Sequence, residues 1–316
     1  MKRPSVPALL ACFLLFTRII ANGQDLSGSA QTDSSFLTDM VTYLSDDSLE
    51  GRGMGTKGSL MAGTMIARQF EKQDMIPFYH RTFTQSFLKD TIIGRNIIGV
   101  VRARYYSEKY IVVSAHYDHL GILGGKIYNG ADDNASGVAI LLDLARYFST
   151  LRTEGKGMPV NIIFAAFDGK EQNMAGSESF LNNLPVSKKD IICNINLDQI
   201  GSTLAPPAKD SNYVLVLGTK SNAGYKRTIE SARTRMNNPI AINYDYYGSA
   251  TFAEIFYKTS DHYNFAKKGI PALLFTSGIH MHTYKPTDDH YFINFPVLLN
   301  RTILIRNLIE TIASSR

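Results

Sequence analysis

The sequence predicts a three-layer α/β/α fold, in which helices cover both faces of a mixed, mostly parallel central sheet. Near-continuous runs of Val, Ile, Leu and Phe recur along the chain, which is typical of strands buried on both faces. Segments with apolar residues at helical spacing separate these runs, so strands and helices alternate. The expected strands are residues 96–101, 110–116, 160–167, 191–198, 213–218 and 271–276.

The expected helices lie before, between and after these strands. Leu60, Ile66 and Phe70 stand at helical spacing, so residues 59–73 predict an amphipathic helix. The Gly-rich segment 50–59 comes before it, and we interpret that segment as a surface loop. Further helices are expected at 136–148, 176–184 and 296–312.

Length and composition predict a folded globular protein. The chain has 316 residues, of which 44% are hydrophobic and 19% charged, so neither a disordered nor a collagen-like chain fits. The length alone allows one or two domains. We expect residues 24–316 to form a single domain.

The first 23 residues have the pattern of a secretory signal peptide. Lys2 and Arg3 precede an apolar stretch over 8–20, and a small-residue cleavage site follows at 21–23. A membrane anchor needs about 20 apolar residues, and Arg18 interrupts a run that is already shorter. A lipoprotein cleavage box is a minor alternative, because the apolar run continues beyond the cysteine. We therefore expect an exported protein, periplasmic or secreted, without a membrane span.

Export changes how the charge and the cysteines are interpreted. The formal net charge is +5, but three basic residues and no acidic ones lie in the expected signal peptide. Without them, 30 basic residues face 28 acidic ones, so we expect no nucleic-acid partner. Cys12 leaves with the signal peptide, and Cys193 is then alone and forms no intrachain disulfide. Its apolar surroundings predict a buried, inert thiol.

His116 ends the expected strand 110–116 and Asp118 follows it, at the edge of the sheet where α/β folds bind ligands. A histidine at a strand end is more often a structural group than a metal ligand. Asp118 follows His116 by two residues, and metal-bound imidazoles usually donate their second N–H to a carboxylate. We therefore interpret His116 as a metal ligand and Asp118 as the residue that orients it.

Three further carboxylates follow in the chain. Asp133 precedes the helix 136–148, where it either caps the helix or binds a cation. Glu171 follows the strand 160–167, and Asp198 ends the strand 191–198, where a buried charge is costly unless it is compensated. One imidazole and three carboxylates fit Zn²⁺.

Further downstream, a His-rich region either lies on the surface or closes over the metal: Asp261, His262, His280, His282 and His290.

Seven motifs resemble, in the same order, those of the secreted di-zinc aminopeptidase-like exopeptidases, metallopeptidase family twenty-eight. The resemblance covers nearly the whole chain after the expected signal peptide, and the ordered set is much more specific than any single motif. The motifs are LSDDSLEGRGMGTKGS, SAHYDHLG, GADDNASG, AAFDGKEQNMAGS, NLDQIG, SDHYNFAKKGIP and KPTDDH.

The resemblance implies an α/β/α exopeptidase with two metal ions bridged by an aspartate. His116 and Asp198 then resemble ligands of the first metal, and Asp118 the residue that supports His116. Asp133 resembles the bridging carboxylate, and Glu171 a ligand of the second metal. The resemblance further implies that the metals activate a shared water as the nucleophile, while the free amine of a peptide substrate binds nearby.

Two positions depart from the family pattern. Lys170 stands where the family has a glutamate that serves as the general base, and a lysine is protonated at neutral pH. Tyr284 replaces a histidine ligand of the second metal, and His282 reaches that position only if the loop shifts. We interpret the Lys170 ammonium as a partial substitute for the second ion, paired with Glu171 or Asp133. One zinc ion is therefore expected, with two as an alternative.

The first functional hypothesis is a zinc-dependent exopeptidase that removes N-terminal residues from peptides with a free N-terminus. Reduced activity is expected, because loss of a positioned base costs about 10²- to 10⁴-fold. Asp198, His262 or His282 is then the alternative proton acceptor. The second hypothesis is a noncatalytic peptide- or amine-binding homologue with zero or one zinc. A single-zinc cyclising transferase ranks last, because it needs the parts of the site that are altered here.

Overall fold

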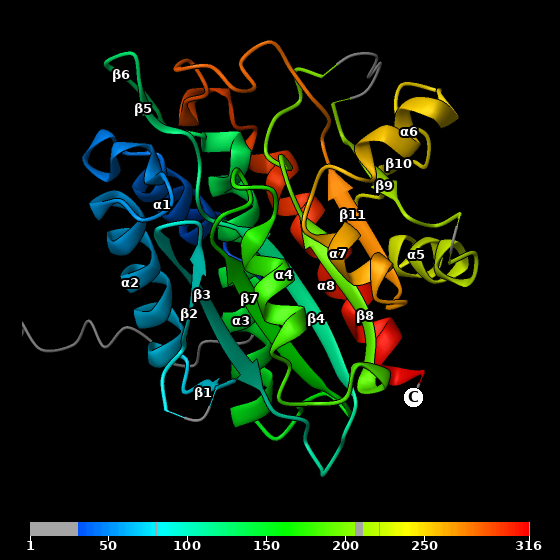
Figure 1. Ribbon diagram of the computed structural model, residues 1–316. Helices are drawn as coiled ribbons and strands as arrows, with labels where there is room; N and C mark the ends of the chain where they lie inside the picture. The colour runs from blue at the N-terminus through cyan, green and yellow to red at the C-terminus, as the bar shows by residue number, and fades with distance from the viewer. Residues whose placement is uncertain (1–30, 80, 206–210, 221, 316) are drawn as a thin grey trace, which may run out of the picture.

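A nine-stranded sheet forms the centre of the structure, a computed structural model that describes residues 31–79, 81–205, 211–220 and 222–315 (Figure 1). The expected signal peptide, residues 1–23, lies outside the described residues. The strand order is β1-β3-β7-β4-β8-β11-β9-β10, with β2 paired to the outer side of β3. Helices cover both faces of this sheet, so the predicted three-layer architecture is confirmed.

The six predicted strands are all present. They are β3 (Ile92–Val101), β4 (Tyr110–His116), β7 (Asn161–Phe167), β8 (Ile191–Leu197), β9 (Tyr213–Leu217) and β11 (Ala272–Thr276). Short strands that the sequence did not predict extend the sheet at its edges: β1 (Ile76–Pro77), β2 (Thr84–Lys89) and β10 (Ala241–Asn243). A separate hairpin consists of β5 (Gly121–Leu123) and β6 (Lys126–Tyr128).

The middle of the sheet is parallel and its margins contain antiparallel pairs. Strand β4 pairs in parallel with β7 and β8, and β8 pairs in parallel with β11. Strand β3 is antiparallel to its neighbours β1, β2 and β7. Because β4, β7 and β8 run in the same direction, the residues that follow them meet at one edge of the sheet.

One face of the sheet carries the helices α1 (Ser34–Leu44), α2 (Lys57–Lys72), α3 (Ser136–Thr153), α5 (Gly224–Thr234) and α8 (Phe295–Ser314). The other carries α4 (Ala175–Asn182), α6 (Ala250–Phe256) and α7 (His262–Lys267). Strand β9 shows how alternation divides the core, since Val214 packs on the first layer and Leu215 on the second. None of the described helices is long and apolar enough to cross a membrane.

The predicted amphipathic helix is α2. The side chain of Thr56 caps it by accepting a hydrogen bond from the backbone N–H of Ser59. Ile66 and Phe70 are fully buried in the core, whereas Leu60 is 49% exposed. Cys193 is fully buried in β8, as predicted.

The expectation of a surface loop over 50–59 is wrong in two places, because Gly51 and Arg52 are buried and residues 57–59 belong to α2. Arg52 is 1% exposed, and Gly51 lies so close to β6 that an added Cβ would stand 2.4 Å from the Tyr128 carbonyl oxygen. The buried guanidinium is tolerated because backbone carbonyls accept its N–H groups. These carbonyls belong to Leu44, Tyr117, Asn129 and Gly130.

Candidate metal centre

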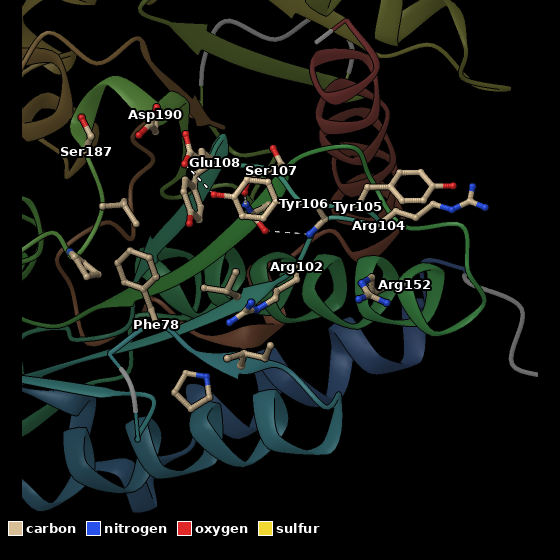
Figure 2. A pocket seen from close by; sticks show the side chains of 18 residues that line it. Phe78, Arg102, Arg104, Tyr105, Tyr106, Ser107, Glu108, Arg152, Ser187 and Asp190 are labelled. Carbon is tan, nitrogen blue, oxygen red and sulfur yellow. Dashed lines mark hydrogen bonds between the residues drawn. The ribbon is translucent and has the colours of Figure 1, made fainter.

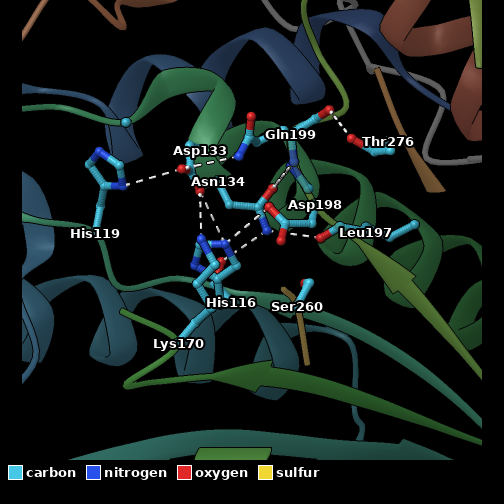
Figure 3. A network of polar contacts seen from close by, with 12 residues as sticks. His116, His119, Asp133, Asn134, Lys170, Leu197, Asp198, Gln199, Ser260 and Thr276 are labelled. Carbon is cyan, nitrogen blue, oxygen red and sulfur yellow. Dashed lines mark hydrogen bonds and ion pairs between the residues drawn. The ribbon is translucent and has the colours of Figure 1, made fainter. Parts of the chain in front are cut away.

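Three predicted ligands meet at the edge where the parallel strands end (Figure 3). His116 is the last residue of β4, and Asp198 follows the adjacent strand β8. Asp133 comes from the turn over Ala131–Ala135 that leads into α3. His116 Nε2 lies 3.2 Å from Asp133 Oδ1 and 3.2 Å from Asp198 Oδ1, and all three residues are buried.

These three side chains fit a zinc ion. One imidazole nitrogen and two carboxylate oxygens lie within 4.8 Å of one another, which is the donor set and compactness that Zn²⁺ requires. Asp133 Oδ1 is buried, and among the described residues it contacts the side chains of His116 and Lys170 as ion pairs without a further hydrogen-bond donor. Burial alone would lower the pKa of His116, but Asp198 and the other carboxylates raise that pKa well above its usual value. A bound cation would compensate the same concentration of negative charge.

Asp118 supports this group through two different parts of the residue. Its backbone carbonyl oxygen lies 3.0 Å from His116 Nδ1, while its carboxylate Oδ1 is 3.7 Å from that nitrogen. The carboxylate instead accepts the backbone N–H groups of Lys170 and Glu171, each at 3.1 Å. Asp118 therefore orients the imidazole mainly with its backbone and fixes the loop after β7 with its side chain.

Asn134 joins three segments of the site, and the sequence reasoning gave it no such role. Its Nδ2 donates to the carbonyl oxygens of Leu197 (2.8 Å) and His116 (3.2 Å). Its Oδ1 accepts the backbone N–H groups of Gly137 and Gln199. The asparagine thus caps the first turn of α3 and holds the ends of β4 and β8 beside it.

The neighbouring aspartate, Asp132, has a structural role. Its carboxylate accepts the backbone N–H groups of Gly201 and Ser202, and His280 Nε2 lies 3.1 Å from Oδ2. The carboxylate of Asp288 in turn accepts the backbone N–H groups of Asp132 and Asp133. These contacts fix the turn that carries Asp133, and they account for His280 without a metal.

The side chain of Lys170 reaches the centre of the site. Its Nζ lies 2.8 Å from Glu171 Oε1, 3.1 Å from the Tyr284 hydroxyl and 3.6 Å from Asp133 Oδ1. The side chain is 4% exposed. Burial would lower the pKa of Lys170, but Asp133, Asp198 and Glu171 outweigh it and raise the pKa well above its usual value. Lys170 is therefore an ammonium ion at neutral pH.

His119 is a candidate ligand that the sequence reasoning missed. It follows Asp118 directly, it is 1% exposed, and neither ring nitrogen has a hydrogen-bond partner among the residues that the structure describes. Burial lowers its pKa to about 4, so the ring is neutral. A ligand atom of His119 lies within 4.8 Å of oxygens of Asp133 and Glu171. The three form a second group able to hold a metal, adjoining the first at Asp133.

The remaining predicted residues lie outside these two groups. His282 Nδ1 bonds to the hydroxyl of Thr287 at 2.9 Å, and its ring stacks on Phe292. His290 pairs with Asp289. His262 begins α7 and packs edge-on against Tyr257, and burial lowers its pKa to about 3.

Two surface cavities differ in their relation to this site. A small cavity of about 130 Å³ borders Asp198, Lys170 and Tyr284, and its other walls are largely apolar or hydroxyl-bearing. A larger cavity of about 630 Å³ lies at the opposite end of the sheet, beside Tyr110 and Asn161, the first residues of β4 and β7 (Figure 2). The residues that line it include none of the candidate ligands, whereas the small cavity borders Asp198.

The model of peptidase family M28 matches residues 96–308. This chain belongs to that family. The matched region contains both groups of candidate ligands. Similar proteins include some that are described as probable zinc metalloproteases. The M28 assignment confirms the resemblance drawn from the seven motifs.

Two curated relatives illustrate the similarity. The alkaline phosphatase isozyme conversion protein of Escherichia coli (strain K12) is 27% identical over 169 residues, which are 48% of the M28 chain and 47% of the relative. Aminopeptidase YwaD of Bacillus subtilis (strain 168) is 30% identical over 145 residues, which are 45% and 28% of the two chains. The alignments thus span about half or less of the relatives' own length.

Solved structures of distant sequence share the fold. A zinc aminopeptidase from Bacillus subtilis superposes with a TM-score of 0.69 at 14% identity, covering 89% of the M28 chain and 95% of the other. A glutaminyl cyclase from Porphyromonas gingivalis superposes with a TM-score of 0.71 at 18% identity, covering 88% and 98%. At these identities the likeness concerns the fold.

Proposed function

We propose that this M28 protein is a zinc-dependent exopeptidase that hydrolyses N-terminal residues from peptides with reduced activity. The observation that supports this most is the buried group of His116, Asp133 and Asp198, which adjoins a cavity of about 130 Å³. A bound Zn²⁺ supplies Lewis acidity toward the scissile carbonyl and lowers the pKa of a coordinated water. The apolar stretch over 8–20 further supports export to the periplasm or the exterior.

The side chains around the metal ligands provide hydrogen-bond donors for the reaction. The Lys170 ammonium and the Tyr284 hydroxyl both line the 130 Å³ cavity. They are placed to donate to the oxygen that becomes negative as the scissile carbonyl is attacked. Asp133 and Asp198 share the task of holding the metal, and Asp118 keeps His116 in position.

Glu171 is the proposed acceptor of the proton of the attacking water, because one of its carboxylate oxygens lies within 4.8 Å of an oxygen of Asp133. Burial raises its pKa to about 7, although the Lys170 ammonium acts in the opposite direction. A general base works best when its pKa lies near the working pH. His262 is a weaker candidate, because burial lowers its pKa to about 3.

The 130 Å³ cavity is the proposed site for the side chain of the substrate's first residue. Its apolar walls come from Tyr246, Phe256, Leu274 and Ile279, and hydroxyl groups of Thr259, Ser260 and Thr276 lie among them. A cavity of this size accommodates a small side chain. We therefore expect alanyl or seryl substrates to be preferred over tryptophanyl ones.

A specific observation favours a second candidate, a noncatalytic peptide- or amine-binding protein. The general-base position holds a lysine that is buried and fixed by Glu171 at 2.8 Å. In this alternative the cavity still receives a peptide terminus, but no proton acceptor completes hydrolysis.

Hydrolysis of aminoacyl-nitroanilides by the zinc-loaded protein separates the two functions. The panel includes small and large side chains and an N-acetylated substrate, and the His116→Ala variant serves as a control that lacks a ligand. Turnover by the wild type, absent in His116→Ala and in the acetylated substrate, supports the exopeptidase. Binding of free-amine peptides without any turnover favours the noncatalytic protein.

A further inference from the structure

The donor set for a second metal ion is present, but a cation of the chain already lies within it. Asp133 and Glu171 are the two carboxylates that would hold such an ion together with His119. Lys170 Nζ stands 2.8 Å from Glu171 Oε1 and 3.6 Å from Asp133 Oδ1. A second divalent ion would have to share both carboxylates with this ammonium, and like charges in a buried site repel strongly.

Tyr284 reinforces this arrangement. Its hydroxyl lies 3.1 Å from Lys170 Nζ, and the ammonium also lies 5.3 Å from the centre of the Tyr284 ring. The same ring is stacked nearly parallel to the imidazole of His119, with 6.2 Å between the ring centres. The Tyr284 hydroxyl therefore contacts the Lys170 ammonium, and its ring lies parallel to the His119 imidazole. Tyr284 has no imidazole nitrogen with which to bind a metal ion.

The His119 imidazole lies in this region but takes no part in the contacts of Lys170 with Glu171, Asp133 and Tyr284. Both ring nitrogens are buried without a hydrogen-bond partner, and Nδ1 lies 3.9 Å from Asp133 Oδ2. Buried imidazole nitrogens normally make hydrogen bonds, so a buried imidazole that makes none within the described part of the chain and lies within 4.8 Å of two carboxylates marks a potential ligand.

We propose that the Lys170 ammonium takes the place of a second metal ion, so that the chain binds one zinc ion at His116, Asp133 and Asp198. The residues His119, Asp133 and Glu171 then form a latent second site that opens when the ammonium is removed. This inference rests on the proposed function only in placing zinc at the first site. It does not depend on whether peptides are hydrolysed.

The test is the number of zinc ions bound per chain. Wild type and variants are stripped with chelator, loaded with Zn²⁺, dialysed, and analysed by mass spectrometry of the metal and by anomalous X-ray scattering. We expect one ion in the wild type and in Lys170→Arg, which keeps the positive charge. Lys170→Met removes the charge at similar length and should bind two ions, whereas the double variant Lys170→Met/His119→Ala should bind one.

Each alternative result overturns the inference in a distinguishable way. Two ions in the wild type would show that the ammonium does not exclude the second ion. A single ion in folded Lys170→Met would show that no latent site exists. If Lys170→Met does not fold, the double variant Lys170→Glu/Tyr284→His replaces it, because it restores both expected family residues. A single zinc ion in that variant would likewise show that no latent second site exists. Absence of peptide hydrolysis alongside these stoichiometries would reject the proposed function and leave the one-ion site standing.

Discussion

The hydroxyl of Tyr284 lies 3.1 Å from the ammonium nitrogen of Lys170, although 114 residues separate them in the chain. The two residues that we interpreted from the sequence as departures from the family pattern are therefore in direct contact. The Tyr284 hydroxyl accepts a hydrogen bond from the Lys170 ammonium. A histidine that binds a metal ion at the same position would instead bring that ion's positive charge next to the ammonium. The two replacements are best understood as one change in the site.

This contact predicts that substitutions at the two positions are not additive. In a double-mutant cycle of Lys170→Met and Tyr284→Phe, we expect a coupling free energy of about 0.5–3 kcal/mol. The coupling free energy should lie near the lower end of this range, because the Tyr284 residue is 46% exposed to solvent. Urea unfolding measures the free energies. As a control, Lys170→Met combined with Tyr106→Phe, a distant exposed site, should be additive within about 0.5 kcal/mol.

Zinc should stabilise the fold through the first group of ligands. At free zinc about 100-fold above the dissociation constant, the expected gain in unfolding free energy is about 2.7 kcal/mol. Chelator should remove this gain from the wild type. Asp198→Asn, directly after β8, should show little gain, while Asp190→Asn, directly before β8, should gain as much as the wild type. Full zinc stabilisation of Asp198→Asn in thermal unfolding would contradict the assignment.

Replacement of the proposed proton acceptor should act on turnover more than on binding. We expect Glu171→Gln to lower kcat by about 10²- to 10⁴-fold. The value of KM should change little, because the amide keeps the size of the side chain. Glu178→Gln, an exposed position in α4, is the matched control. An unchanged kcat in Glu171→Gln would show that another group, such as Asp198, accepts the proton of the attacking water.

His262 should make the fold sensitive to acid. Burial lowers its folded-state pKa to about 3, whereas an unfolded histidine titrates near 6.5. Between these values the unfolded chain binds a proton that the folded chain does not. The stability present above pH 6.5 is therefore lost as the pH falls toward 3, by about 1.4 kcal/mol per pH unit.

The variant His262→Phe isolates this contribution, because it keeps an aromatic ring against Tyr257. The unfolding free energy of the variant minus that of the wild type should be constant from pH 7.5 to 8.5. It should then rise by about 1.4 kcal/mol per unit below pH 6. A difference that stays flat through pH 5 would mean that His262 accepts a proton in the folded protein.

The sheet was predictable because its middle strands are buried on both faces. Residues 110–116 and 191–198 are mostly apolar, so apolar runs and strands coincide. Their interior polar side chains, Ser114, Asn194 and Asn196, are buried and hydrogen-bonded to one another. The edge strands β1 and β10 have two and three residues, too few for a periodic pattern. Their pairing depends on neighbours far away in the chain, which local sequence does not specify.

The first metal group was predictable because each ligand follows a strand or precedes a helix in a parallel arrangement. His119 was missed, since the chain leaves the strand at His116 and the position of the next turn depends on tertiary contacts. One such contact is the His119 backbone N–H with the Arg52 carbonyl oxygen at 3.4 Å. The available signal was a second histidine directly after Asp118, which resembles an ordinary loop residue.

The four carbonyls around Arg52 also bear on where this protein can be divided. The family model begins at residue 96, but the turn at Asn129 and Gly130, which leads to Asp133, is tied to Arg52 and through it to Leu44. A fragment trimmed to the matched region would keep every candidate ligand and lose the guanidinium that joins those carbonyls. The region matched by the family model is therefore smaller than the unit that we expect to fold cooperatively.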